Sequence, residues 1–380
     1  MPHALRFHLQ TSLSVEDLGL LWRDLEARSD NTFFLSWQWM AAWIGELGAA
    51  PPLLIGEASG GLILLGFVVP YSRREGGILR FDGLRLHSTG VWEQDCIAIE
   101  YNGFLVDRGW EGRAEQEAIA WLLNQQQIGK LRPQELHITA MLEQHRMAWT
   151  PPRTLTQIPY RKPSWRVDLK AMRASGTKYL DSLSANTRQQ VRRAMRLYDD
   201  AGGLSVSWAD DIPTAFSYLD GLKQLHQHQW EGRGKPGGFA SSFFEGFQRR
   251  LITACLPQRF VELVRVSRGT EPIGYLYNLI WRGQVFAFVS GLLIEDDNRL
   301  KPGLVCHTLC IEHHLRSGAA IYDFMAGEFR YKASLGHPGP DFIYLLIQKD
   351  TAAARLEQAV RKGRDQLRGL SNRVMRRPSA

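Results

Sequence analysis

The chain has 380 residues, of which 44% are hydrophobic, a composition typical of a packed globular protein of two or three domains. Its longest uncharged apolar run, residues 58–72, is too short for a membrane-spanning helix, and the N-terminus lacks a signal-peptide pattern. Four cysteines provide no disulfide framework, so we expect a cytoplasmic protein. Most of the net charge of +7 lies in residues 349–380, so the nearly neutral body disfavours general nucleic-acid binding.

The first half of the chain alternates short apolar strands with amphipathic helices. Ser14 begins a capping box for a helix to about residue 28, and Ser36 caps a second helix that carries Trp37 and Trp39. These tryptophans are typical core residues, although they could also form a wall of an acceptor pocket. Strands are predicted at 4–10, 52–58, 61–71, 77–82, 95–99 and 135–139, with a helix at 111–128. Prolines between residues 151 and 163 indicate a linker.

The second half repeats this order of elements. Arg282-Gly283 breaks two apolar runs, which predicts a β-hairpin. Strands are predicted at 165–169, 259–267, 272–281, 284–290, 320–325 and 341–347, and helices at 176–183, 185–200, 213–229, 240–254 and 303–316. We therefore predict an α/β (α+β) fold with two lobes, each a mixed, mainly antiparallel sheet flanked by helices. The expected units are residues 1–160, 161–348 and a basic C-terminal helix or tail at 349–380.

A candidate anion site lies where the helix after residue 301 begins. Lys301-Pro302-Gly303 precedes an amphipathic helix, whose first N–H groups have no partner within the helix and whose dipole favours negative charge. Arg299 and Lys301 add formal charge. A diphosphate would fit such a site, and a solvated loop before an ordinary helix is the alternative.

Several short motifs, taken in order, resemble the BioF2-like, CelD (BcsL)-like acetyltransferases of the GNAT superfamily, which are related to the FemAB peptidyltransferases. The resemblance covers about residues 30–350 and implies two GNAT-like lobes, with acyl transfer from acetyl-CoA or another acyl-CoA in the second lobe. The motifs are Phe34–Trp39 with Trp43, Ser184–Arg193, His226 with Trp230–Gly234, Pro302-Gly303, Tyr322-Asp323-Phe324, Gly327 and Tyr331-Lys332.

Acyl transfer to an amine needs a group that accepts a proton from the attacking amine. Asp323 lies in an apolar strand, where burial would raise its pKa, and Glu328 follows a predicted turn at Gly327. Either could be the base, although Asp323 could equally have a structural role; Glu231 and His226 are weaker candidates.

Tyr331 and Lys332 are further catalytic candidates. In FemAB relatives a similar Tyr-Lys element lies at the donor and acceptor site, which the resemblance carries to these positions. The lysine could bind a phosphate or developing negative charge, and the phenol could protonate the leaving sulfur. A surface lysine beside a packing tyrosine is the alternative.

The remaining candidates concern binding. Arg188 and Arg192 lie on one stripe of a predicted helix, which could bind a phosphate or be a solvated face. The cofactor-binding candidates are Arg299, Lys301, Gly303, Leu304, Arg188 and Arg192, and the substrate-binding candidates are Trp37, Trp39, Trp230 and Arg233. Cys306 and Cys310 share one helix with three histidines, a pattern that suits packing better than zinc, so we expect no metal.

These observations and the resemblance predict a GNAT-type N-acyltransferase that moves an acyl group, with acetyl expected, to an amine of a small molecule or amino sugar. The family name suggests envelope or exopolysaccharide metabolism. The alternatives are a FemAB-like aminoacyl-tRNA-dependent transferase and a non-catalytic scaffold of a polysaccharide-synthesis complex. An acyl carrier protein is a possible partner, the basic tail could contact a membrane surface, and nucleic acid is expected only for the tRNA alternative.

Overall fold

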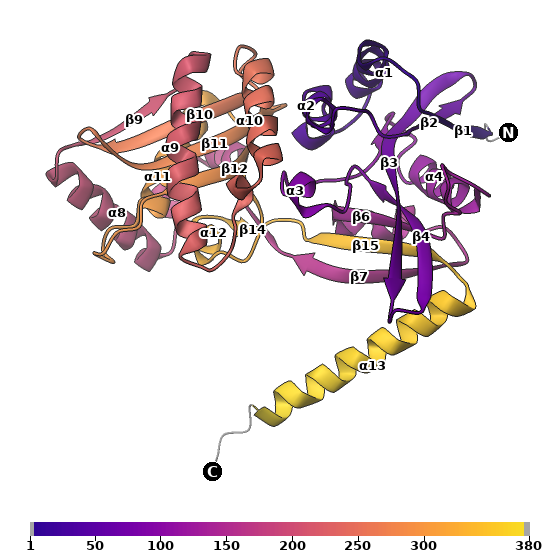
Figure 1. Cartoon of the computed structure of the whole chain (residues 1–380). Coiled ribbons are helices and arrows are strands. Elements are labelled where there is room, and N and C mark those ends of the chain that lie inside the picture. Colours follow the sequence, from indigo (N-terminus) through magenta and orange to yellow (C-terminus); the bar gives the residue numbers. More distant parts are fainter. Residues whose placement is uncertain (1–3, 376–380) are drawn as a thin grey trace.

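The computed structural model describes residues 4–375, with side chains described through Arg364. The described residues form two mixed, mainly antiparallel sheets with helices packed on their faces (Figure 1). The predicted α/β fold with two lobes is therefore confirmed. Within this part of the chain, no helix combines the length and the apolarity required to cross a bilayer.

The first sheet contains one parallel pair, β4 with β6, and is otherwise antiparallel. In spatial order its strands are β1 (Leu5–Gln10), β2 (Leu53–Ala58), β3 (Gly61–Glu75), β4 (Leu79–Leu86), β6 (Glu135–Leu142), β15 (Phe342–Lys349) and β7 (Thr154–Lys162), with β5 (Leu105–Val106) beside β3. Helices α1 (Val15–Ala27) and α2 (Trp37–Leu47) pack on one face, and α4 (Arg113–Asn124) packs on the other.

The second sheet likewise contains one parallel pair, β12 with β13. Its strands, in spatial order, are β14 (His337–Pro338), β8 (Ser164–Asp168), β13 (Ile321–Ala326), β12 (Gln284–Leu292), β11 (Glu271–Trp281), β10 (Val261–Arg268) and β9 (Leu204–Trp208). Helices α9 (Ile212–Glu231) and α10 (Ser242–Cys255) cover one face. Helices α6 (Leu169–Ser175), α8 (Ala185–Asp200) and α11 (Pro302–Ser317) cover the other.

Five shorter or peripheral helices complete the description. They are α3 (Trp92–Asp95), α5 (Arg146–Trp149), α7 (Tyr179–Ser182), α12 (Arg330–Leu335) and α13 (Ala352–Met375). The last of these projects away from the first lobe (Figure 1).

The helix boundaries follow from local chemistry, as the sequence predicts. The Ser14 hydroxyl accepts a hydrogen bond from the Asp17 N–H at 3.1 Å, and the Ser36 hydroxyl accepts one from the Trp39 N–H at 3.2 Å. Each bond satisfies a backbone donor that the first helical turn leaves unpaired. Helix C-termini follow the same logic. Helix α11 ends at Gly318, which adopts a left-handed conformation with φ 97°.

One hydrophobic core extends across both lobes. The rings of Phe34, from the first lobe, and Phe286, from β12, meet edge to face with their centroids 5.8 Å apart. The Arg282 side chain donates to the Glu26 carbonyl at 2.8 Å, and the Trp281 indole donates to the Asn31 carbonyl at 3.2 Å. The lobes are therefore joined by packed core and not only by a linker.

Two sequence predictions differ from the structure in this region. Residues 95–99 are not a strand: Asp95 ends α3 and accepts hydrogen bonds from the Thr89 and Gly90 N–H groups at 2.8 and 2.7 Å, which closes a loop. The proline-containing segment predicted as a linker contains β7, whose edge position tolerates Pro159.

The position of strand β15 differs from the expected second unit, residues 161–348. It was expected in the second lobe, but it pairs with β6 and β7 in the first sheet. The chain thus returns to the first lobe before α13 begins.

Candidate functional site

The second sheet opens between its two parallel strands. β12 and β13 pair only over residues 284–286 and 321–323, so the edge of β12 beyond residue 286 has no neighbouring strand on that side. A cleft of about 320 Å³ lies against this part of β12. Its lining residues come from both lobes: residues 96–98, the end of α9, residues 287–292 of β12, His307 and residues 329–332.

Helix α9 lies very close to β12 above the cleft. A Cβ atom at Gly291 would lie 2.3 Å from the Leu222 carbonyl oxygen, so only glycine allows this approach. The Gln229 side chain donates to the Leu292 carbonyl at 2.9 Å, and His226 Nδ1 lies 3.1 Å from the Ser290 carbonyl oxygen. The N–H and C=O of one strand residue point to the same side, so the Ser290 and Leu292 N–H groups also face this open edge.

His226 lines the cleft, and its ring nitrogen Nε2 is buried. Because Nδ1 faces a carbonyl oxygen, it carries the hydrogen and Nε2 is an acceptor; Nε2 has no hydrogen-bond partner among the described residues. Burial lowers the pKa of His226 below its usual range, and the nearby Arg233 charge lowers it further. The ring is therefore neutral at pH 7, with a lone pair that can accept a proton.

The opposite wall is formed by Tyr331 and Lys332. The Tyr331 ring stacks on His307 with centroids 5.2 Å apart and an interplanar angle of 14°, and burial raises the pKa of its phenol. Lys332 Nζ donates to the Phe324 and Ala326 carbonyls at 2.6 and 2.8 Å. Burial lowers the pKa of Lys332, against the opposing effect of nearby carboxylates. This ammonium is thus held by the backbone of β13 where that strand diverges from β12.

The two predicted bases, Asp323 and Glu328, do not line the cleft. Asp323 is buried, and its carboxylate accepts hydrogen bonds from the Met325 N–H at 2.6 Å and from the Tyr101 hydroxyl. Burial raises the pKa of Asp323, as expected. Its oxygens are nevertheless committed to holding β13 against the first lobe, and Glu328 is exposed to solvent.

A carboxylate that the sequence did not single out also lies between β13 and the first lobe. Glu100 accepts a hydrogen bond from the Ala326 N–H at 2.9 Å, and burial raises its pKa to about 7. Glu100 and Ala326 are 226 residues apart, and no local pattern marks residue 100. Only a covariation signal between the lobes could have found it.

The mouth of the cleft contains the predicted pair Trp230 and Arg233. The Arg233 guanidinium lies over the Trp230 ring at 5.5 Å and over the Phe329 ring at 5.4 Å. Both predicted residues therefore line the cleft, where a cation held between two aromatic rings can bind an anionic or polar group.

The other predicted aromatic residues, Trp37 and Trp39, lie elsewhere. Both are buried in the shared core. Trp39 packs against Phe288, which lines the cleft, with ring centroids 5.7 Å apart. Trp39 thus lies behind the cleft wall, whereas Trp37 packs against α1, with the Arg23 guanidinium 5.8 Å from its ring centroid.

The predicted phosphate site at the start of α11 lies beside the inner end of the cleft. A Cβ atom at Gly303 would lie 3.1 Å from Cδ1 of Leu292, a cleft residue. The first N–H bonded within the helix is that of Val305, to the Lys301 carbonyl, which leaves the Gly303 and Leu304 N–H groups available. The Arg299 guanidinium is less available to bind a phosphate, because it forms an ion pair with Asp297 at 2.7 Å.

Arg188 and Arg192 lie on α8, which packs beside α11. The sequence places no acid on this stripe, but Asp181 of α7 approaches both guanidinium groups, at 3.9 and 3.8 Å. Neither residue lines the cleft. Both remain candidates for contact with a distant part of a bound donor.

The two cysteine residues of α11 are packed in the core. Cys306 and Cys310 are fully buried, and the Asn278 amide donates to the Cys310 sulfur at 3.2 Å. In the described part of the chain, no group of three His, Cys, Asp or Glu residues is arranged to hold a metal ion.

Part of the second lobe matches a known family model. Residues 185–333 match the family model described as an acetyltransferase (GNAT) domain. No curated protein sequence matches the chain.

Three solved structures share the fold of nearly the whole chain. The structure of FemX is 11% identical with a TM-score of 0.55, covering 93% of this chain and 99% of that one. L-PGS from Bacillus licheniformis is 11% identical with a TM-score of 0.51, covering 87% and 92%. The C-terminal domain of a putative lysylphosphatidylglycerol synthetase from Agrobacterium fabrum is 9% identical with a TM-score of 0.51, covering 91% and 96%.

Proposed function

We propose that this chain, which carries a GNAT-type acetyltransferase domain at residues 185–333, is an acyl-CoA-dependent N-acyltransferase. The proposed acceptor is an amine of a small molecule or amino sugar. The proposal is carried by one observation: the edge of β12 that has no neighbouring strand beyond residue 286 lines one cleft together with His226, Tyr331 and Lys332. A cytoplasmic location belongs to the proposal, supported by four cysteines that form no disulfide.

The binding groups suit a phosphorylated thioester carrier. The Gly303 and Leu304 N–H groups, with Lys301 beside them, can bind a diphosphate at the start of α11. The edge of β12 can bind an extended chain, because the Ser290 and Leu292 N–H groups face the cleft. Acyl-CoA supplies the activated acyl group when it is bound. Arg188 and Arg192 remain proposed contacts for a further phosphate.

The chemistry assigned to the protein is limited, because a thioester is already activated. His226 Nε2 accepts the proton of the attacking amine, since this nitrogen is neutral and unpartnered. An N–H group of the β12 edge stabilises negative charge that develops on the carbonyl oxygen. The Tyr331 phenol, which stays protonated, can donate to the departing sulfur. Lys332 keeps β13 apart from β12 through its two carbonyl contacts.

The first experiment measures binding and thiol release together. Saturating acetyl-CoA at about 100 times its Kd should stabilise the folded chain by about 2.7 kcal/mol, which raises Tm by several degrees. Thiol release across several acyl-CoAs, with a panel of amines and amino sugars, then identifies donor and acceptor. Tyr331→Phe should slow turnover while the Tm increase persists, and the exposed Lys170→Ala should change neither.

Three outcomes would contradict the proposal. If no acyl-CoA raises Tm, the donor site is wrongly assigned. Turnover only with an aminoacyl-tRNA would favour the FemAB-like alternative. A Tm increase without thiol release for any amine would favour a binding module.

A further inference from the structure

Arg233 joins the two walls of the cleft. Its guanidinium lies 5.5 Å from the centroid of the Trp230 ring and 5.4 Å from that of the Phe329 ring. The Trp230 ring lies beside His226, with centroids 5.8 Å apart, and the Phe329 ring lies beside Tyr331, with centroids 6.1 Å apart. These five residues, all of which line the cleft, form an arch between the two groups proposed to transfer protons.

The positive charge of Arg233 acts on both of these groups. Burial has the largest effect on the pKa values of His226 and Tyr331, and the Arg233 charge lowers both. The guanidinium therefore lies near the place where the acyl group would be transferred. An anion bound to Arg233 would lie there too.

The turn that follows α9 positions Arg233. The N–H groups of Arg233 and Lys235 both donate to the Trp230 carbonyl at 3.0 Å, and the Gln227 side chain donates to the Pro236 carbonyl at 2.8 Å. The backbone of Arg233 is thus fixed, and its guanidinium is held between two rings. A side chain that is ordered before its ligand arrives loses less conformational entropy on binding.

Arg233 has no acidic partner. Within the described part of the chain, its side chain forms no hydrogen bond or ion pair, and no Asp or Glu is among the residues that line the cleft. The other cation of the lining, Lys332, is already held by the Phe324 and Ala326 carbonyls. Arg233 is therefore the cation of the cleft that a ligand can neutralise.

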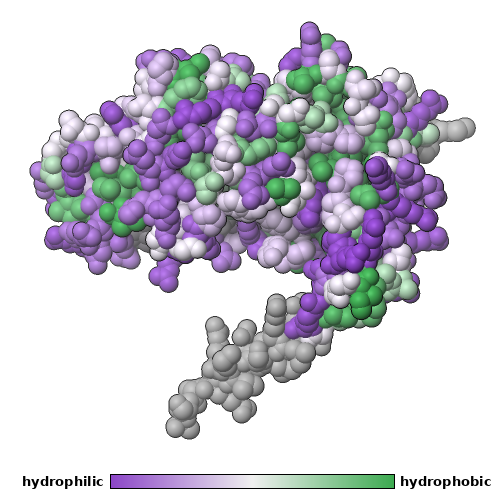
Figure 2. All heavy atoms as spheres, viewed as in Figure 1, coloured by the Kyte–Doolittle hydropathy of each residue, from purple (hydrophilic) through white to green (hydrophobic). Residues whose placement is uncertain are grey.

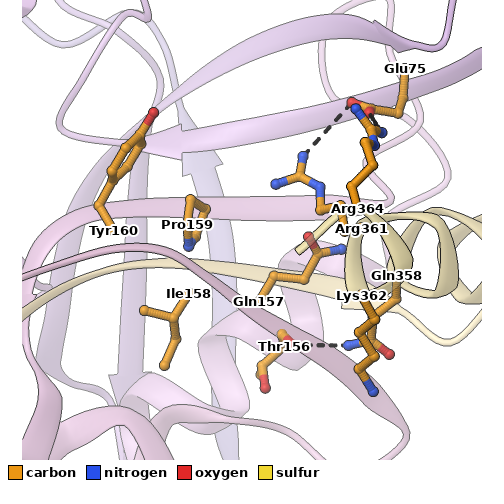
Figure 3. Close-up of a pocket in the computed structure, with 10 residues that line it drawn as sticks. All are labelled: Glu75, Thr156, Gln157, Ile158, Pro159, Tyr160, Gln358, Arg361, Lys362 and Arg364. Atoms are coloured by element: carbon orange, nitrogen blue, oxygen red, sulfur yellow. Dashed lines mark hydrogen bonds and ion pairs between the residues drawn. The ribbon is translucent and has the colours of Figure 1, made fainter. Parts of the chain in front are cut away.

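Charged side chains are common on the surface, so charge alone does not mark a ligand site. Figure 2 shows a mostly hydrophilic face of the molecule. The groove between β7 and α13 (Figure 3) measures about 610 Å³, and its lining residues Arg361 and Arg364 both pair with Glu75, at 3.7 and 2.7 Å. Arg233 differs from these two arginines, because it lines a cleft and has no such partner.

We propose that the amine acceptor carries a second, anionic group, a carboxylate or a phosphate, which the Arg233 guanidinium binds. This inference rests on the proposed acyl transfer. The donor does not supply such an anion beside the reacting groups, because the pantetheine arm of coenzyme A separates its phosphates from the thioester. The N–H groups that suit those phosphates lie at the start of α11. A guanidinium can bind a carboxylate or a phosphate through two parallel hydrogen bonds.

The test measures binding to the full chain by titration calorimetry, with two pairs of amines. We compare 4-aminobutanoate with 4-aminobutanamide, and glucosamine 6-phosphate with glucosamine, so that each pair differs in one anionic group. We expect the anionic member of at least one pair to bind about fivefold more tightly, the upper range for an ion pair that solvent can reach. The pair that shows the preference distinguishes a carboxylate from a phosphate.

Arg233→Gln should abolish this preference and keep the Tm increase with acetyl-CoA. The control Arg330→Gln alters an exposed arginine outside the cleft lining and should keep both. Tm of each unliganded variant verifies that the chain remains folded.

Equal binding within both pairs, no binding of any of these amines, or a preference that survives Arg233→Gln would each overturn the proposal. So would the loss of acetyl-CoA binding in Arg233→Gln, because the guanidinium would then contact the donor. A preference that Arg233→Gln abolishes, without thiol release for any amine, would support the anion site and contradict only the proposed acyl transfer.

Discussion

At the scale of single residues, the hydrogen bonds of a titratable group decide what it can do. Asp323 and His226 both lie in the second lobe, and burial shifts both pKa values. The Asp323 carboxylate is occupied by the Met325 N–H and the Tyr101 hydroxyl. His226 has only Nδ1 occupied and keeps Nε2 free. The histidine is therefore the better proton acceptor, although a carboxylate in an apolar strand is the more conspicuous sequence signal.

We expect His226→Gln to lower the rate of acyl transfer by about 10²–10⁴-fold. A base acts in its unprotonated form, so activity is lost as pH falls through its pKa. Since burial lowers the pKa of His226 from 6.5, the midpoint of this decline should lie below pH 6.5. A pH profile of kcat with acetyl-CoA measures both effects.

The matched control is His228→Gln, which alters an exposed histidine of the same helix outside the cleft. It should leave the profile unchanged. If His226→Gln keeps the wild-type rate and profile, another group accepts the proton.

At the scale of elements, the position of α9 on β12 creates the cleft wall. Gly291 allows the α9 backbone to contact the strand, which brings His226 and Gln229 within reach of the β12 carbonyls. A side chain at this position would meet the Leu222 backbone, which cannot move without shifting the helix. The geometry of the site therefore depends on a residue that has no chemistry of its own.

Gly291→Ala should destabilise the chain by about 1–3 kcal/mol, the usual cost of overpacking, and should also reduce turnover by displacing His226. Urea unfolding and thiol release measure these effects. The control Gly61→Ala, at the start of β3, introduces a Cβ atom 3.6 Å from the Ala58 carbonyl oxygen, an ordinary contact. That variant should keep full activity, and equal losses in both variants would contradict this account of α9.

At the scale of the whole molecule, the seam between the lobes supports the site. The first lobe supplies Glu100 and Tyr101, which bind β13 near the point where it separates from β12. The first lobe also supplies residues 96–98 of the cleft lining. The opening in the second sheet thus depends on contacts from the first lobe, and the site belongs to the two lobes together.

Glu100→Gln should make the stability of the chain less dependent on pH. Burial raises the pKa of Glu100 from 4.5 to about 7, so the folded state holds this proton more tightly than the unfolded state does. The stability contribution of Glu100 therefore falls as pH rises from 4.5 to 7. The amide keeps an acceptor for the Ala326 N–H without the charge.

The stability of Glu100→Gln relative to wild type should consequently increase over this pH range, as measured by urea unfolding at pH 4.5 and 7.5. The exposed Glu16→Gln should change stability by less than about 0.5 kcal/mol. A constant difference between Glu100→Gln and wild type across this range would contradict the raised pKa.

The sequence by itself determined the features that depend on neighbouring residues. The caps at Ser14 and Ser36, the hairpin at Arg282-Gly283 and the helix beginning after Lys301 each require only a few adjacent side chains, and all are present. The order of elements and the family resemblance predicted the two-lobed α/β fold, which composition alone does not show. Four residues of the short motifs, Trp230, Arg233, Tyr331 and Lys332, line the cleft, and their roles there stay predictions.

Only the tertiary structure decided which distant segments meet. It placed β15 in the first sheet, paired Glu100 with Ala326, and placed Trp39 behind the cleft wall. The physical reason is that burial and hydrogen bonding across hundreds of residues leave no periodic pattern in the chain. A sequence shows which side chains can perform the chemistry, and folding decides which of them line the cleft.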